Sequence, residues 1–185
     1  MRELSLHILD VAENGITAGA NCIWIEVEEE RKKDQLKIVI RDNGRGMPVD
    51  KLENIDDPFI TTRTTRRVGL GLSLLATAAG RCEGTMQVDS KPGKGTEITA
   101  TFRFNHIDRA PLGDMAATIT TLIMGNPEID FVYFHRIDGH AYTLDTREIR
   151  AEMEDLSLSD PVVIHHLTET IRSALKALSS NESKS

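Results

Sequence analysis

The alternation of apolar and polar residues divides the first hundred residues into helices and strands. A 3.6-residue period over residues 2–20 predicts a helix that ends near Gly19. Alternation over "NCIWIEVEEE" predicts a half-buried strand at 21–30, and "RKKD" is a turn before a returning strand at 35–42. Further on, the pattern predicts a helix at 72–82 and two strands, at 84–90 and 95–104, which flank the turn "KPGKG".

Between these elements lies a stretch without a clear period. Residues 47–55, "MPVDKLENI", predict at most a short helix, and residues 56–71 are rich in Thr, Arg and Gly and predict a long loop. The pattern changes after Phe104, where we predict helices at 111–125, 146–156 and 161–178 around a hairpin of 130–136 and 140–145. We therefore expect one unit over 1–105, a C-terminal extension over 106–178 and a disordered tail over 179–185.

Composition narrows the classes of function. The chain has 185 residues, of which 39% are hydrophobic and 28% charged, and a net charge of −7, which argues against binding nucleic acid or anionic membranes. No apolar run is long enough to span a bilayer, and acids within the first fifteen residues argue against a signal peptide. Cys22 and Cys82 fit neither a metal site nor a disulfide framework, so we expect a reducing, cytoplasmic setting.

The N-terminal helix has one polar and one apolar face. At about 100° per residue, Asp10 and Asn14 lie together with His7 within roughly 60°. Leu4, Ile8, Val11 and Gly15 form the face that can pack on a sheet. An Asn in the middle of a helix gains little unless its amide has a partner, and a neutral carbonyl oxygen is a suitable ligand for a hydrated Mg²⁺. A solvated polar face explains the same pattern.

The stretch "RDNGRGM" follows the second strand and is more than a hairpin signal. Asn-Gly after an apolar strand usually marks a two-residue hairpin, yet the chain continues with another Gly and a Pro and not with a strand. A carboxylate at the strand end, Asp42, can accept a hydrogen bond from an exocyclic amine. Gly44 and Gly46 would let the backbone approach a flat ring.

The stretch "TTRTTRRVGLGLSLL" leads from a basic loop into a helix. Gly69 and Gly71 bring free backbone N–H groups to a helix N-terminus, which is an anion site, and Arg63 adds positive charge before it. It is not a dinucleotide fingerprint, because Leu74 stands where a third Gly is needed, and "GKGT" at 93–96 is not a P-loop. At the start of the strand predicted at 95–104, Thr96 can turn its hydroxyl toward a ligand beside Asp42.

Together and in this order, Asp10…Asn14, "DNGRGM", "DPFITTR…GLGLSLL" and "GKGTEITATF" resemble the ATP-binding fold shared by gyrase-type ATPases, heat-shock chaperones, MutL and sensor histidine kinases. The combination of "DPF" and "GLGLS" resembles the histidine-kinase branch most. The resemblance covers most of residues 1–104. It implies a two-layer α/β sandwich, known as the Bergerat fold, in which a mixed sheet carries helices on one face and the C-terminal part adds a small α+β extension.

The resemblance also implies roles for individual residues. Asn14 would bind Mg²⁺, Asp42 the adenine amino group with Thr96 nearby, and residues 57–71 would form a lid over ATP. The nucleotide site would also include Gly44, Gly46, Met47, Phe59, Thr61, Arg63, Gly69, Leu70, Gly71 and Leu72. ATPases of this type carry a general-base Glu four residues before the Asn, where this chain has the shorter Asp10, and histidine kinases usually have Ala where this chain has Gly15.

Three functions remain open after this comparison. The first is a free-standing Mg²⁺–ATP-binding protein kinase or slow ATPase of histidine-kinase type in signal transduction, without a sensor or a conventional phosphoacceptor bundle. The second is a serine kinase resembling the anti-sigma factors, and the third is an ATP-gated interaction module without turnover. We expect a protein partner or phosphoacceptor, with a homodimer through the C-terminal region as one option.

Histidines in the C-terminal part suggest two further sites. His106, Arg109, Pro111 and Leu112 match the spacing of a histidine-kinase phosphoacceptor box, although Ile107 stands where an acid usually follows the His. A simple linker explains the same residues. His135, His140, His165 and His166 have no spacing known for metal sites, so we expect an apolar contact surface on 161–178 and no metal.

Overall fold

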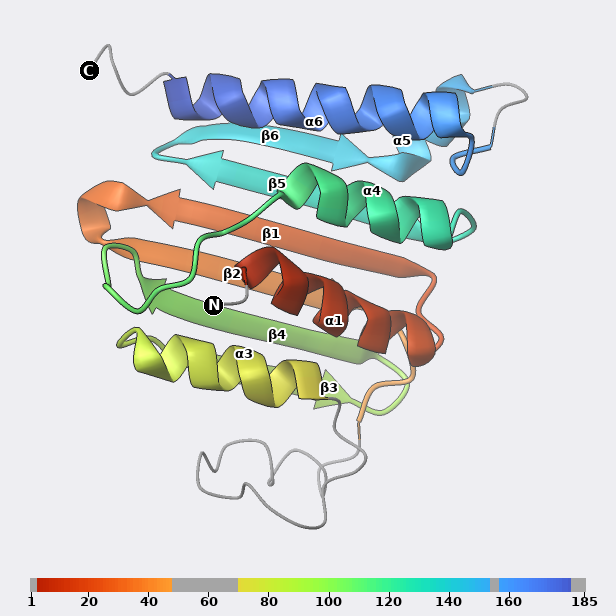
Figure 1. Cartoon of the computed structure of the whole chain (residues 1–185). Helices are drawn as coiled ribbons and strands as arrows, with labels where there is room; N and C mark the ends of the chain where they lie inside the picture. Colours follow the sequence, from red (N-terminus) through yellow and green to blue (C-terminus); the bar gives the residue numbers. More distant parts are fainter. Residues whose placement is uncertain (1–2, 48–69, 154–156, 181–185) are drawn as a thin grey trace.

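A single mixed sheet of six strands organises the protein. The computed structural model describes residues 3–47, 70–153 and 157–180. The strands lie in the order β3-β4-β2-β1-β5-β6 (Figure 1). Their bounds are β1 Cys22–Glu30, β2 Gln35–Asp42, β3 Met86–Lys91, β4 Gly95–Arg103, β5 Asp130–Ile137 and β6 His140–Asp145. All neighbouring pairs are antiparallel except β1 and β5, which run parallel.

Helices cover one face of this sheet, which confirms the predicted two-layer α/β sandwich (Figure 1). The described helices are α1 Leu4–Thr17, α3 Leu70–Arg81, α4 Met115–Gly125, α5 Thr146–Glu152 and α6 Pro161–Ser180, with a 3₁₀ turn η1 at Arg31–Lys33. The predicted apolar face of α1 is buried, since Leu4, Ile8 and Val11 are at most 2% exposed. Asn14 on the opposite side is exposed.

The other face of the sheet is polar. Even-numbered residues of β1 point to it, and there the guanidinium of Arg41 lies 4.5 Å from the ring centre of Trp24. Beside this pair, Glu28 of β1 lies 3.7 Å from the ammonium of Lys37 and also pairs with Arg136 of β5. An antiparallel sheet with one covered and one solvated face shows this alternation.

The C-terminal extension continues the same sheet. β5 pairs with β1 from Cys22↔Asp130 to Glu29↔Ile137, and β6 pairs with β5. The predicted hairpin is therefore present, and its side chains join one hydrophobic core that runs from α3 to α6. The division of the chain at 105/106 stays a prediction, but β5 and β6 share a sheet with the first part.

Several predicted boundaries differ from the structure, among them the start of α4 and the end of α6. The helix predicted from residue 111 begins at Met115, because Asp114 caps it by accepting the N–H of Ala117 at 2.9 Å. The residues before this cap extend along α1, where Pro111 and Leu112 offer their carbonyls to the first N–H groups of α1. At the other end, α6 continues to Ser180, two residues into the segment predicted to be disordered.

A buried polar chain joins β1 to β5 at the end of the strands away from Asp42. The hydroxyl of Tyr133 lies 2.6 Å from Nδ1 of His135, and Nε2 of His135 lies 2.9 Å from the carboxylate of Glu29. Burial by itself raises the pKa of Glu29, but the hydrogen bond and charge of His135, with Arg31, outweigh it and lower the pKa below its ordinary value. A lowered carboxyl pKa adds stability above the unfolded-state value that is lost as the pH falls.

We predict that Glu29→Gln flattens the acid limb of the stability curve. The wild type should lose stability as the pH falls below about 4.5, the ordinary value for the carboxyl, because Glu29 must then be protonated. The variant has no carboxylate to titrate there, so its free energy of unfolding should depend less on pH in this range. Urea denaturation between pH 3 and 7 measures both curves, and parallel curves would contradict the prediction.

Candidate functional site

The polar face of α1 lies next to the start of α3. A Cβ placed on Gly71 would lie 2.8 Å from Cβ of Asp10, so the absence of a side chain lets the first turn of α3 approach Asp10. Asn14, one turn further along α1, is exposed, and its side chain makes no hydrogen bond to another described residue. The structure therefore places Asp10, Asn14 and the start of α3 together, as expected of a site for phosphates and a hydrated cation.

Asp42 ends β2 beneath α1. Its carboxylate accepts the N–H of Gly44 at 2.8 Å. A Cβ on Gly15 would lie 2.9 Å from Cβ of Asp42, which explains why this chain has Gly immediately after Asn14. Burial raises the pKa of Asp42, and hydrogen bonds from the backbone of Gly44 and Thr96 offset this only in part. The fold therefore holds a half-buried carboxylate without a countercharge among its described hydrogen-bond partners.

We predict that Gly15→Ala weakens nucleotide binding and does not stabilise the protein. Alanine favours a helix over glycine by about 1 kcal/mol, but here its methyl must displace Asp42, which costs about 1–3 kcal/mol as overpacking does. Gly80, in α3, is the matched control, because a Cβ there meets nothing within 4 Å. Gly80→Ala should raise the melting temperature, whereas Gly15→Ala should not; equal increases in both variants would refute the packing argument.

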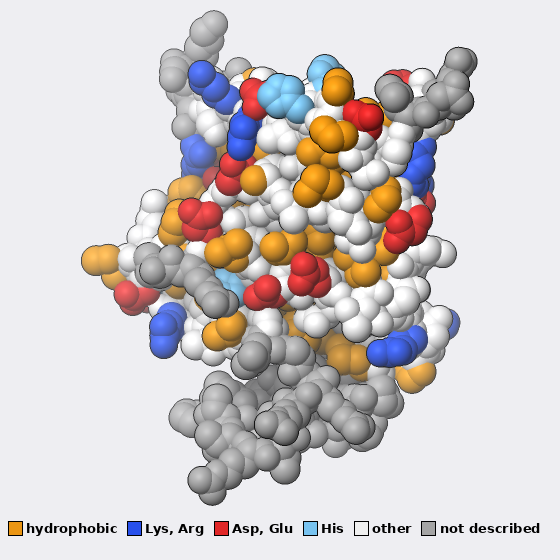
Figure 2. Space-filling model, turned by 45° about the vertical axis from the view of Figure 1, so that its right-hand side comes forward, with side chains coloured by type: hydrophobic (Ala, Val, Ile, Leu, Met, Phe, Trp, Pro, Cys, Tyr) orange, Lys and Arg blue, Asp and Glu red, His pale blue; other side chains and the backbone are white. Residues whose placement is uncertain are grey.

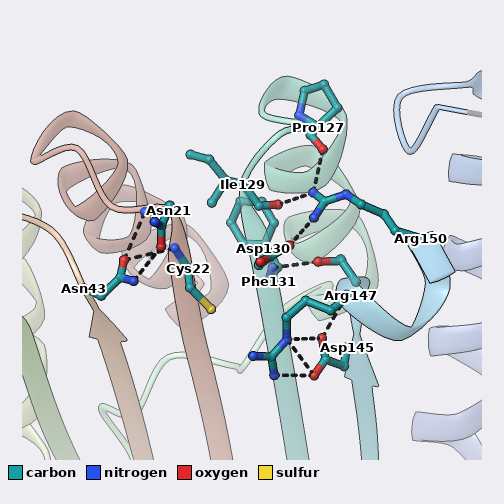
Figure 3. Close-up of polar contacts among 11 residues, drawn as sticks. Asn21, Cys22, Asn43, Pro127, Ile129, Asp130, Phe131, Asp145, Arg147 and Arg150 are labelled. Carbon is teal, nitrogen blue, oxygen red and sulfur yellow. Dashed lines mark hydrogen bonds and ion pairs between the residues drawn. The ribbon is translucent and has the colours of Figure 1, made fainter.

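Asn43 fixes the direction of the chain as it leaves β2. Its Oδ1 accepts the N–H groups of Asn21 and Cys22, both at 3.0 Å, and its Nδ2 donates to Oδ1 of Asn21 at 2.6 Å (Figure 3). On the other side of β1 the backbone N–H of Asp130 donates to Asn21. The "DNG" stretch is thus a braced strand end, and sequence reasoning missed the role of Asn43 in it.

The loop after Asn43 packs against the turn between β3 and β4. Gly46 has φ +66°, and a Cβ there would lie 2.1 Å from the carbonyl oxygen of Lys91. The N–H of Met47 donates to Oγ of Ser90 at 2.8 Å. Ser90 also contacts Oγ1 of Thr96 at 2.8 Å and the carbonyl oxygen of Gly95 at 3.0 Å. Met47 and Thr96 therefore lie on one hydrogen-bonded network beside Asp42.

Ser90 is a second residue that sequence reasoning missed. It is buried, and it faces Thr96 directly across the β3–β4 pair. The signal was present in the sequence, because two strands joined by "KPGKG" place the residue before the turn opposite the residue after it.

Parts of the predicted nucleotide site lie outside the described residues. Phe59, Thr61, Arg63 and Gly69 belong to this group, and with them most of the expected lid. Among the described members, Leu70 and Gly71 begin α3, and Leu72 is a core residue with 4% exposure. The backbone of Leu72 remains available to a ligand, but its side chain anchors α3 to the sheet.

His106 lies at the far end of the sheet from Asp42. In β4, Thr96 is the partner of Asp42, and the strand ends at Arg103, whose carbonyl accepts the N–H of His106. Seven strand steps of about 3.3 Å separate the two ends by about 20 Å. The imidazole lies 3.8 Å from a carboxylate oxygen of Glu83. Transfer of phosphate to His106 within one chain is therefore not supported, and its role as an acceptor stays a prediction for transfer between chains.

The remaining described surface shows neither a metal cluster nor a spanning helix. No group of three or more His, Cys, Asp or Glu side chains is placed to hold a metal ion within the described ranges. Among the described helices, none is both long and apolar enough to cross a membrane. Figure 2 shows acidic and basic side chains interspersed with apolar ones over the helix layer. Two of the C-terminal histidines, His165 and His166, are exposed on α6.

The relatives of the chain are longer proteins. It is 36% identical over 105 residues to the sensor protein kinase FleS of Pseudomonas aeruginosa, which covers 57% of this chain and 25% of the relative. It is 32% identical over 110 residues to the sensor histidine kinase ZraS of Escherichia coli O157:H7, covering 60% of this chain and 24% of the relative. The chain thus spans about a quarter of the length of each.

Structural comparison supports the fold independently. The N-terminal domain of a DNA repair protein superposes with a TM-score of 0.53 at 16% identity, over 85% of this chain and 55% of that one. Residues 2–106 match the family described as histidine kinase-, DNA gyrase B- and HSP90-like ATPases. This range contains Asp10, Asn14, Asp42 and Thr96, the described residues that the fold gathers at one end of the sheet. The chain therefore belongs to the family of histidine kinase-, DNA gyrase B- and HSP90-like ATPases.

Proposed function

We propose that the protein binds Mg²⁺–ATP at the end of β2 and acts as a regulatory protein of histidine-kinase type. The observation that carries this proposal is Asp42, a half-buried carboxylate at a strand end. Its neighbours are Gly15, Gly44 and Thr96, which leave a carboxylate oxygen free to accept a hydrogen bond from adenine. A buried acceptor of this kind gains most from a ligand that brings its own donor.

The polar face of α1 fits the metal and the phosphates. The amide oxygen of Asn14 is exposed and free of other described partners, as a ligand for hydrated Mg²⁺ requires. Asp10 and the first turn of α3 lie beside it through the contact at Gly71. When bound, Mg²⁺ neutralises phosphate charge, and the N–H groups at the start of α3 add partial positive charge. Asp10 is placed to orient a water or hydroxyl group.

Titration calorimetry tests nucleotide binding directly. ATP injected into the protein with Mg²⁺ should give a saturable heat with one site per chain, and removal of Mg²⁺ with EDTA should weaken the affinity. CTP is the control nucleotide, because it carries a pyrimidine in place of a purine. Equal heats for ATP and CTP would contradict an adenine site at Asp42.

Two alternatives fit the same pocket. A serine kinase resembling the anti-sigma factors would transfer phosphate to a protein hydroxyl, and an ATP-gated interaction module would transfer none. The shorter Asp10 at the usual place of a general base favours slow turnover and keeps the second alternative open. Incubation with γ-labelled ATP and a cell extract separates them, since phosphohistidine is acid-labile, phosphoserine is acid-stable and the module gives no label.

A further inference from the structure

The hydroxyl groups of Ser90 and Thr96 contact each other, and the donors and acceptors around them can be counted. A serine hydroxyl has one proton to donate and two lone pairs to accept. Oγ of Ser90 has three neighbours, which are the N–H of Met47 at 2.8 Å, the carbonyl oxygen of Gly95 at 3.0 Å and Oγ1 of Thr96 at 2.8 Å. An N–H can only donate, and a carbonyl oxygen can only accept.

These facts fix the direction of the third bond. Met47 takes one lone pair of Ser90, and the proton of Ser90 goes to Gly95, which has no proton to give. When all three contacts are made at once, Thr96 donates its own proton to the remaining lone pair of Ser90. Every bonding position of Ser90 is then filled, which a buried hydroxyl favours because an unmade bond costs about 1–3 kcal/mol.

Thr96 is left with lone pairs only. It stands opposite Asp42 in the β2–β4 register, so the two side chains project to the same face of the sheet with Cβ atoms about 5 Å apart. Asp42 offers carboxylate oxygens. Thr96 donates its proton to Ser90 and therefore offers only oxygen lone pairs. The end of the pocket therefore presents acceptors alone to the edge of a base.

We propose that Ser90 is the residue that makes this site specific for a 6-aminopurine, by holding the hydroxyl of Thr96 as an acceptor. This rests on the proposed nucleotide site at Asp42. The amino group of adenine brings two N–H donors, which match an acceptor-only pocket. The 6-carbonyl of hypoxanthine brings an acceptor to the same place, where it meets other acceptors. Ser90 acts through Thr96 and is a positioning residue.

The test compares ATP with ITP, whose bases differ in the group at position 6 and in the proton that hypoxanthine carries on the neighbouring N1. The wild type should bind ATP at least about 100-fold more tightly than ITP. In Ser90→Ala, Thr96 loses its acceptor, and its free proton can turn toward the 6-carbonyl. The preference for ATP should then fall about 10-fold, by weaker binding of ATP and stronger binding of ITP. Competition against a fluorescent ATP analogue measures both affinities.

Further variants separate specificity from packing. Ser90→Thr keeps a hydroxyl and should restore the wild-type preference, and Ser90→Cys, whose sulfur is a weak acceptor for the proton of Thr96, should give an intermediate one. In a Thr96→Val background, Ser90→Ala should leave the ATP-to-ITP ratio unchanged, because no hydroxyl remains to be oriented. A purely structural role would lower both affinities by the same factor and would do so in either background.

The outcomes are distinct. An unchanged ATP-to-ITP ratio in Ser90→Ala, or an equal loss of preference with Thr96→Val present, overturns the role of Ser90 while leaving the nucleotide site intact. If Ser90→Ala does not fold, the ratio in Ser90→Cys decides in the same way. A wild type that binds neither nucleotide rejects the site at Asp42 and the specificity argument with it.

Discussion

Replacing Asp42 by Asn should abolish ATP binding without harming the fold. In the proposed site the half-buried carboxylate accepts a hydrogen bond from the adenine amine, and a charged acceptor contributes about 1.5–3 kcal/mol, or roughly 10- to 100-fold in affinity. An Asn side chain keeps an oxygen for the N–H of Gly44, yet its amide nitrogen can turn a donor toward the donors of adenine. We therefore expect a loss of at least about 100-fold.

The same substitution should leave the melting temperature unchanged or higher. Burial raises the pKa of Asp42. A raised carboxyl pKa adds stability below the pKa of the unfolded state, and this added stability is lost as the pH rises through the pKa of the folded state. At pH 7 the ionised carboxylate therefore costs stability, and a neutral amide removes this cost. A melting temperature that rises while ATP binding is lost would show that Asp42 is kept for binding at the expense of stability.

Calorimetry with ATP and a thermal melt of the apo protein measure the two effects. Asp89→Asn is the matched control, because Asp89 is an exposed acid of β3 on the polar face of the sheet. It should change neither quantity much. An Asp42→Asn variant that binds ATP as the wild type does would show that the base is bound elsewhere, and a strongly lowered melting temperature would refute the cost assigned to the carboxylate.

Gly95→Ala should be the most damaging single change near the site. Gly95 has φ +89°, and a Cβ there would lie 1.9 Å from the carbonyl oxygen of Asp42. Neither backbone can move without breaking the β2–β4 pairing at its Asp42 end. We expect a loss of about 3 kcal/mol or more in the free energy of unfolding, together with loss of nucleotide binding.

Gly93→Ala separates the two causes of this loss. Gly93 lies in the same turn with φ +74°, but a Cβ there meets nothing within 4 Å. Its substitution should cost only the left-handed conformation of alanine, about 1–2 kcal/mol, and should leave ATP affinity intact. Urea denaturation of both variants checks this, and equal losses would mean that backbone conformation alone explains the effect at Gly95.

The sequence predicted the strands better than it predicted contacts between distant parts of the chain. Regular alternation located β1, β2, β5 and β6 almost to the residue, because side chains of a half-solvated sheet must alternate. The start of α4 was predicted too early. The carbonyls of Pro111 and Leu112 accept hydrogen bonds from the first N–H groups of α1, so these residues are not part of a helix. Tertiary contacts of this kind leave no local pattern.

Among the site residues, those in local motifs could be predicted and those that act through distant contacts could not. Asp10, Asn14, Asp42 and Thr96 could be found from ordered motifs, since each contributes a group that a nucleotide needs. Asn43 and Ser90 hold these groups in place through contacts across strands, which the pairing of the strands indicates and a local motif does not. Gly15 was noticed as a departure from the usual Ala, but only its 2.9 Å approach to Asp42 explains it.

The parallel pairing of β1 with β5 has a consequence for how the protein folds. The paired residues Cys22 and Asp130 are separated by 108 positions, the difference of their residue numbers. β1 is therefore paired only with β2 until the chain has been made beyond Ile137, and its other side carries unpaired N–H and C=O groups until then. Such long-range closure is slow, and the open edge of β1 can capture a strand of another molecule in the meantime. Fragments that end before β5 should aggregate, and α4 with β5 should be the last elements to gain protection from hydrogen exchange during refolding.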